Sequence, residues 1–207
     1  METQERILEK AHELFLKFGI RSVSMDEIAA HLGISKKTIY HFFADKDHLV
    51  QGVLQIEISK TEEECVMQKQ NRENAIHEIF LAQDMLQEML QNFNPSHLYD
   101  LEKYHPRAFR QFKEHHDDYL YGVIKENLET GIKEELYRPN INTDILTRFR
   151  MGSMFMAFNT EYFPMGKYSL PTLIYEMTDN FLHGIVTPKG TELIQQYQLQ
   201  RKININQ

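Results

Sequence analysis

The sequence is poor in several residue types, and each shortage excludes a class of protein. It has one cysteine, Cys65, so no internal disulfide can form, and a cytosolic location is expected. No apolar run approaches the roughly 20 residues that span a bilayer. The charged start METQERILEK lacks the apolar stretch of a signal peptide. We therefore expect a cytoplasmic protein with no membrane partner.

Glycine and proline are also scarce, with 9 and 6 among 207 residues. Apolar residues recur at steps of three and four, which predicts helices rather than strands. The length suffices for one core, or for a small module joined to a larger bundle. We therefore expect an all-α protein.

The spacing and the capping residues predict where the helices lie. The third expected helix should bury Ile39 and Phe42, and the tail from Arg201 should fray. Gly33 allows a sharp turn before it, and SMDE at 24–27 is the pattern of a capping box. The expected helices cover residues 2–18, 25–32, 36–42, a long fourth helix after Asp45, 73–93, a short one capped by Ser96, 106–131, 143–163, 171–186, and a last one toward Tyr197.

The charge is unevenly distributed. A net charge of −7 argues, as an average, against binding nucleic acid. The first 50 residues, however, hold seven basic and eight acidic side chains, and the segment from Gly33 to Phe43 holds no acid. That segment carries two lysines and a histidine. The segment of this short helix thus carries no acidic residue, although the chain as a whole is acidic.

The segment HLGISKKTIYHFF at 31–43 has the pattern of a helix-turn-helix. This motif needs a small residue in its first helix, a glycine at the turn and inward apolar residues in its second helix. Ala29, Gly33 and Ile39 stand at the required offsets. Recognition helices contact base edges with their first residues, and a short helix suffices for a major groove. The side chains left outside are Lys36, Lys37, Thr38, Tyr40 and His41.

These residues carry a family resemblance. AHELFLKFG, SMDEIAAHLGIS, TIYHFF and DKDHLV match the pattern of the tetracycline-repressor (TetR) family, and the chain resembles that family over about its first 50 residues. The resemblance implies a ligand-responsive transcriptional repressor that binds a palindromic double-stranded DNA operator as a homodimer. It also implies a helix-turn-helix domain at 1–47 and a helical effector-binding and dimerisation domain at 48–207.

The resemblance also implies which side chains meet DNA. Lys36, Lys37 and Thr38 correspond to positions that read bases, and hydroxyls and helix N-termini suit phosphate. Two residues have another interpretation, since Tyr40 can lean on the core and His41 can be an ordinary surface histidine. The whole segment can also be a bundle hairpin with solvated lysines. The predicted DNA-binding set is Ser24, Ser35, Lys36, Lys37, Thr38, Tyr40, His41 and Lys46.

The rest of the chain is rich in Phe, Tyr and Met. Such residues are mostly core, but they also suit an adaptable pocket for a small apolar or aromatic effector. The expected pocket residues are Met89, Phe93, Phe112, Tyr119 and Phe158. The predicted helix at 143–163 is apolar nearly all round, so it belongs in a dimer interface or at the centre of a monomer. The expected interface residues are Phe149, Gly152, Phe155, Met156, Met177 and Phe181.

The sequence gives little support for a catalytic or metal-binding function. Glu9 with His12 and Glu102 with His105 have the spacing of di-iron bundles, but the first pair lies in the helix-turn-helix domain and the second ends at Pro106. No nucleophile elbow, phosphate loop or zinc motif is present. We therefore expect no metal, no cofactor and no catalytic residue. The alternative function is a helical small-molecule binding protein or an enzyme that uses the C-terminal cavity.

Overall fold

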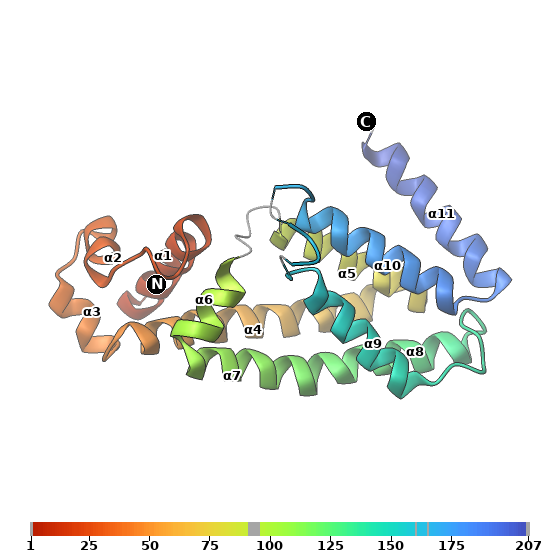
Figure 1. The fold of residues 1–207 in the computed structure, drawn as a ribbon, viewed down its shortest axis with the longest axis horizontal. Helices are drawn as coiled ribbons and strands as arrows, with labels where there is room; N and C mark the ends of the chain where they lie inside the picture. The colour runs from red at the N-terminus through yellow and green to blue at the C-terminus, as the bar shows by residue number, and fades with distance from the viewer. Residues whose placement is uncertain (1, 91–95, 160, 165, 206–207) are drawn as a thin grey trace. The chain divides into compact units, whose positions relative to one another are not determined.

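The structure, a computed structural model, describes residues 2–90, 96–159, 161–164 and 166–205. Helices build it, and no strand occurs among the described residues (Figure 1). The prediction of an all-α fold is confirmed. Every helix in this part of the chain is too short or too polar to cross a lipid bilayer.

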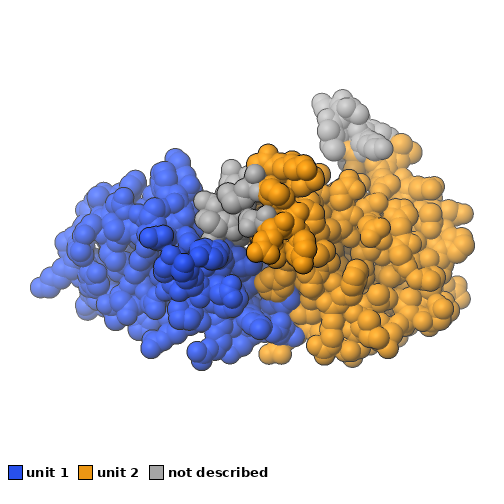
Figure 2. All heavy atoms as spheres, in the orientation of Figure 1, with its two compact units in different colours: residues 1–63, 92–117 blue, residues 64–91, 118–207 orange. Residues whose placement is uncertain are grey.

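The chain forms two compact units (Figure 2). Unit 1 comprises residues 1–63 and 92–117, and unit 2 comprises residues 64–91 and 118–207. These bounds describe packing, whereas the boundary expected after residue 47 divides the chain by function. That functional boundary stays a prediction.

Unit 1 has a single hydrophobic core. Its centre is made of aliphatic side chains that are fully buried, among them Ile7, Ile28, Ile39 and Leu49. Leu101 and Ala108 complete the core from later in the chain. The helices of this unit are α1 (Thr3–Phe18), α2 (Met25–Leu32), α3 (Lys36–Phe42), the first part of α4 (Lys46–Asn71), α6 (Ser96–Tyr104) and α7 (Pro106–His115).

The predicted caps of α2 and α3 are confirmed. The Ser24 hydroxyl accepts a hydrogen bond from the Glu27 backbone at 3.2 Å, and the Glu27 carboxylate accepts one from the Ser24 backbone at 2.6 Å. Gly33 ends α2 in the left-handed conformation, with φ 65°, which glycine adopts cheaply. Ser35 then accepts from the Thr38 backbone at 3.1 Å and starts α3.

The prediction that Phe42 is buried is wrong. Phe42 is 38% exposed, and its neighbour Phe43 is only 5% exposed. Helix α3 ends at Phe42, and Phe43 adopts an extended conformation with φ −128°. The change from helical to extended backbone directs the next ring, rather than the last helical one, into the core.

Histidines from other segments of unit 1 face the carboxylates of α4. Each contact joins residues that are distant in the sequence, so together they hold the first part of α4, from Asp47 to Glu62, against the rest of this unit. The distances are 2.5 Å for His12–Glu57 and 3.4 Å for His115–Glu62. The third pair is His105–Asp47.

Unit 2 has a separate core built around Tyr137, which is fully buried. Its hydroxyl donates to the Asn127 side chain at 3.1 Å, and Asn127 donates to the Ala75 carbonyl at 2.9 Å. The helices of this unit are the end of α4, α5 (Ala75–Leu90), α8 (Tyr121–Lys133), α9 (Thr143–Met156), α10 (Leu170–Ile185) and α11 (Pro188–Ile205).

A π-helical turn, His116–Leu120 (η1), joins α7 to α8. The helix predicted at 106–131 is therefore found as the succession of α7, this turn and α8, and it ends at Lys133. The expected helix at 73–93 is α5, and residues 91–93 lie outside the described part of the chain. The side chain of the expected cap Ser96 is likewise not described.

Two predicted helix ends are wrong. Helix α9 ends at Met156 rather than residue 163, because the Asn159 side chain accepts hydrogen bonds from the backbones of Glu161 and Tyr162 and competes with the helix. The tail is helical to Ile205. The Arg201 guanidinium holds it by donating to the Phe80 carbonyl at 2.5 Å and by pairing with Asp84.

The two glycines of α8 should respond in opposite ways to alanine. A Cβ at Gly131 would overlap the ring of Tyr137, whereas a Cβ at Gly122 meets nothing within 4 Å. We expect Gly131→Ala to lower the free energy of unfolding by about 1–3 kcal/mol, and Gly122→Ala to raise it by up to about 1 kcal/mol. Urea unfolding followed by circular dichroism measures both. Equal effects of the two substitutions would contradict this account of the core.

The stability of the chain should fall as the solution is acidified below neutrality. His97 is 7% exposed, and its Nε2 donates to the Phe15 carbonyl at 2.5 Å. Burial lowers the pKa of His97 in the folded chain, although the bond to Phe15 partly opposes this. The unfolded chain therefore takes up the proton first, near pH ~6.5, and stability is lost as the pH falls through that value toward the folded pKa.

The substitution His97→Gln keeps a donor and removes the titration. We expect the free energy of unfolding to fall less between pH 7 and pH 5 in this variant than in the unchanged chain, as measured by urea unfolding at each pH. His41→Gln, at an exposed position, is the control. Parallel pH profiles for the unchanged chain and His97→Gln would rule out this role for His97.

Candidate functional site

Helix α3 presents a basic and aromatic surface because one side chain fixes its orientation. Ile39 is fully buried, while Tyr40 is 43% exposed. Lys36, Lys37 and His41 are also exposed, and the ammonium of Lys36 lies 5.9 Å from the centroid of the Tyr40 ring. The side chains expected to remain outside therefore do so, except that Thr38 is half-buried. We call the exposed face of Lys36, Lys37, Tyr40 and His41 the α3 surface.

One lysine of the α3 surface already holds an anion. The Lys36 ammonium donates to the Asp26 carboxylate at 2.8 Å, which raises the pKa of Lys36. Both side chains are about half exposed, so the pair adds little to stability and can exchange partners. Asp26 belongs to the first turn of α2, so this contact also links the two helices of the motif.

The other predicted DNA-binding residues lie in more constrained positions. The hydroxyls of Ser24 and Ser35 accept backbone hydrogen bonds as helix caps, and both residues remain exposed. Lys46 is half-buried, and its ammonium lies 3.4 Å from the Arg21 carbonyl, to which it donates. Burial lowers the pKa of Lys46, and the carboxylates of Glu27 and Asp100 partly oppose this.

The residues predicted to form an effector pocket do not line the cavity found in unit 2. Met89 is 50% exposed, Tyr119 and Phe158 are half-buried, and Phe112 packs against the core of unit 1. Phe93 lies outside the described residues. Their role in effector binding stays a prediction.

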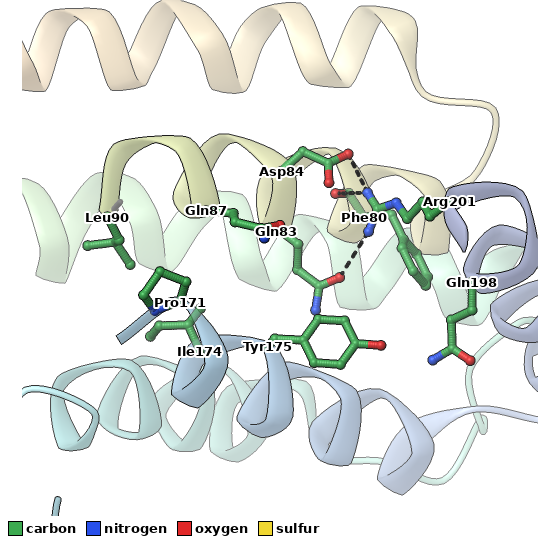
Figure 3. Close-up of a pocket in the computed structure, with 10 residues that line it drawn as sticks. All are labelled: Phe80, Gln83, Asp84, Gln87, Leu90, Pro171, Ile174, Tyr175, Gln198 and Arg201. Atoms are coloured by element: carbon green, nitrogen blue, oxygen red, sulfur yellow. Dashed lines mark hydrogen bonds and ion pairs between the residues drawn. The ribbon is translucent and has the colours of Figure 1, made fainter. Parts of the chain in front are cut away.

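Unit 2 contains a cavity of about 500 Å³ between α5, α10 and α11 (Figure 3). Sequence reasoning missed it because Arg201, a central residue of its wall, was placed in a frayed tail. The apolar part of the wall is Phe80, Leu90, Pro171 and Ile174, and the polar part is Gln83, Asp84, Gln87, Tyr175, Gln198 and Arg201.

Most of the predicted dimer residues lie at the surface of the single chain. Phe149 is 58% and Met156 is 42% exposed. Gly152 is exposed, and Phe155 and Met177 are half-buried. Phe181 is only 5% exposed and packs in the core of unit 2, so its place in the interface stays a prediction that the single chain does not support.

The apolar surface of α9 extends one turn further than predicted. Ile145 is 61% exposed and stands four residues before Phe149, so it lies on the same helical face as Phe149, Gly152 and Met156. We call these four residues the α9 stripe. Its spacing was visible in the sequence.

A buried arginine of α9 was also missed. Arg150 is 8% exposed, its guanidinium donates to the Thr178 hydroxyl at 2.5 Å, and it lies over the Phe181 ring. Burial lowers the pKa of Arg150 to about 10. No periodic pattern distinguishes such an arginine from an exposed one.

The Glu-x-x-His pairs of the sequence do not converge on a metal site. Across the described residues, no three side chains of His, Cys, Asp or Glu are placed to hold a metal ion together. His12 and His105 instead face Glu57 and Asp47 of α4.

Comparison with known proteins bears on this arrangement. Residues 7–53 match the model of the bacterial regulatory proteins of the tetR family. Over 195 residues the chain is 26% identical to an uncharacterized HTH-type transcriptional regulator, YvaF, of Bacillus subtilis (strain 168), covering 91% of this chain and 98% of that protein.

Solved structures share the fold across nearly the whole chain. A TetR-family transcriptional regulator from Marinobacter aquaeolei VT8 superposes with a TM-score of 0.74 at 19% identity, over 97% of this chain and 98% of that one. A putative transcriptional regulator from Saccharomonospora viridis, in complex with choline, gives 0.68 at 19% identity, over 89% and 97%.

The helix-turn-helix surface and these likenesses define the class as helix-turn-helix transcriptional regulators, which are not enzymes. Within that class, residues 7–53 carry the N-terminal domain of the tetR family, and the chain as a whole resembles TetR-family regulators in its fold.

Proposed function

We propose that the chain is a cytoplasmic, ligand-responsive repressor that binds a palindromic operator as a homodimer. Each protomer places α3 in a major groove, and a small-molecule effector bound by the C-terminal domain releases the DNA. The functional boundary near residue 47 separates these two tasks.

The observation that supports this docking is the α3 surface. Ile39 is fully buried and sets the rotation of α3, so that Lys36, Lys37 and Tyr40 share the outer side. Lysine can donate to the O6 and N7 atoms of guanine, while hydroxyls and ammonium groups position phosphates. Lys36, Lys37 and Thr38 are the proposed base-proximal residues. The proposed phosphate contacts are Ser24, Ser35, Tyr40, His41 and Lys46.

A homodimer supplies the second recognition helix. The exposed α9 stripe is an apolar surface of the kind that pairs two copies about a two-fold axis. Two recognition helices about 34–36 Å apart fit half-sites one helical turn apart. We assign Phe149, Gly152, Phe155, Met156 and Met177 to this interface.

An effector acts by favouring a dimer geometry in which the recognition helices no longer match that spacing. A difference of about 1–3 kcal/mol in effector affinity between the two geometries suffices for a useful switch. The regulator from Saccharomonospora viridis with bound choline supports a small-molecule effector for a protein of this fold.

Removing Lys37 and Tyr40 from the α3 surface should abolish operator binding. We expect the variant Lys37→Ala, Tyr40→Ala to show no mobility shift on a palindrome selected from random DNA by the unchanged chain. The unchanged chain should lose affinity steeply as salt rises, because phosphate contacts release counterions. The control is Lys133→Ala, Tyr168→Ala, which removes the same residue types from exposed positions in unit 2. An unchanged shift in the α3 variant would disprove this placement of the DNA contact.

A charge in the α9 stripe should separate the protomers. Phe149 is 58% exposed in the single chain, so Phe149→Glu leaves the fold intact but places a carboxylate in the proposed apolar interface. Light scattering after gel filtration should report a dimer for the unchanged chain and a monomer for the variant. Val66→Glu, at a 50% exposed position of α4, should remain a dimer. A dimeric Phe149→Glu would exclude this face as the interface.

A further inference from the structure

We infer that the cavity between α5, α10 and α11 binds an uncharged amphipathic molecule, with an apolar body and a carbonyl-type oxygen as hydrogen-bond acceptor. Its volume of about 500 Å³ falls within the range of small-molecule sites. It is distinct from the pocket of Met89, Phe112, Tyr119 and Phe158 that the sequence suggested.

The polar wall presents hydrogen-bond donors. Gln83 is only 7% exposed, and its amide oxygen lies 3.5 Å from the Arg201 guanidinium. Its amide nitrogen is directed toward Tyr175 (Figure 3). Burial raises the pKa of Tyr175, so its phenol stays protonated and can donate at neutral pH. Tyr175 is 43% exposed, and together with the Gln83 amide it offers hydrogen-bond donors that a ligand carbonyl in the cavity can accept from.

The charges of the wall are already paired. Arg201 pairs with Asp84, donates to the Phe80 carbonyl at 2.5 Å and lies 4.4 Å from the centroid of the Phe80 ring. An anionic ligand would have to displace Asp84 from this arginine, and a cationic ligand would be repelled by it. Desolvating a charged ligand adds a further cost. The wall therefore selects an uncharged head.

The apolar side chains of the wall form the part of the cavity that binds the apolar body of the ligand. Leu90 and Ile174 are 3% and 4% exposed, and Pro171 adjoins them at the start of α10 (Figure 3). An apolar chain laid along these side chains gains the free energy of leaving water, about 0.8 kcal/mol for each buried methylene.

Regulation by this site rests on the proposed function. Tyr175 of the wall stands on α10 two residues before Met177, which is assigned to the dimer interface. A ligand that orders this part of α10 favours one dimer geometry and thereby one spacing of the recognition helices. Binding itself does not depend on that step.

Three eight-carbon probes with the same body test the inference. Octanamide has an uncharged acceptor, octanoate an anionic head and octylammonium a cationic head. We expect titration calorimetry on the full chain, without DNA, to show saturable binding of octanamide and weaker binding of the other two. No saturable binding of octanamide would overturn the inference, and tighter binding of either charged probe would overturn the ligand class.

Two variants locate the binding. Gln83→Met removes the buried donor and keeps the volume, and Gln87→Trp fills the cavity from an exposed position. We expect each substitution to lower the affinity for octanamide at least about fivefold, which corresponds to the loss of one hydrogen bond or more. The controls Gln195→Met on α11 and Glu88→Trp on α5, at exposed positions outside the wall, should bind normally. Unchanged affinity in both cavity variants would place the site elsewhere.

Operator binding is measured separately by fluorescence anisotropy, first with no probe present. If the chain binds its operator but shows no saturable binding of octanamide, only this inference is contradicted. Saturable octanamide binding by a chain that binds no operator contradicts the proposed function and leaves the site standing.

Discussion

The orientation of α3 depends on burying Ile39. A helix of seven residues has too few backbone hydrogen bonds to persist alone in water, where helices shorter than about 12–15 residues are marginal. Its stability comes from the core of unit 1, in which Ile39 is fully covered, and from the Ser35 cap. Because one buried side chain fixes the rotation of the helix, the identities of its outward residues are fixed as well. The basic surface is thus a consequence of packing.

The fold was readable from the sequence wherever the signal was local. Helix starts marked by Ser24 and Ser35 were found because a cap requires only residues within the same turn. The errors lie where a distant or competing interaction decides. Helix α9 stops at Met156 because the Asn159 side chain captures the backbone beyond it, and α11 persists because Arg201 reaches Phe80, far away in the sequence. The burial of Phe43 instead of Phe42 depends on one backbone torsion at a helix end.

The two candidate sites differ in how well the sequence predicted them. The α3 surface lies within one short segment, so residue spacing alone predicts which side chains point outward. The cavity of unit 2 draws Gln83, Tyr175 and Arg201 from three helices separated by many residues. Its polarity depends on which arginine pairs with which acid, and this is a property of tertiary packing. An aromatic-rich composition indicated a pocket but gave no means of choosing among the many Phe, Tyr and Met residues that fill the core.

The contact between Lys36 and Asp26 has a further consequence. Under the proposed docking, Asp26 occupies the place of a nucleic-acid acceptor while the protein is free, and this contact restricts the rotamers that Lys36 samples. Less side-chain entropy is then lost on meeting the duplex. The exchange also leaves a carboxylate beside the DNA, and that anion disfavours any register in which a phosphate falls next to it. A single acidic residue of α2 thereby helps to reject misaligned complexes as well as to prepare the correct one.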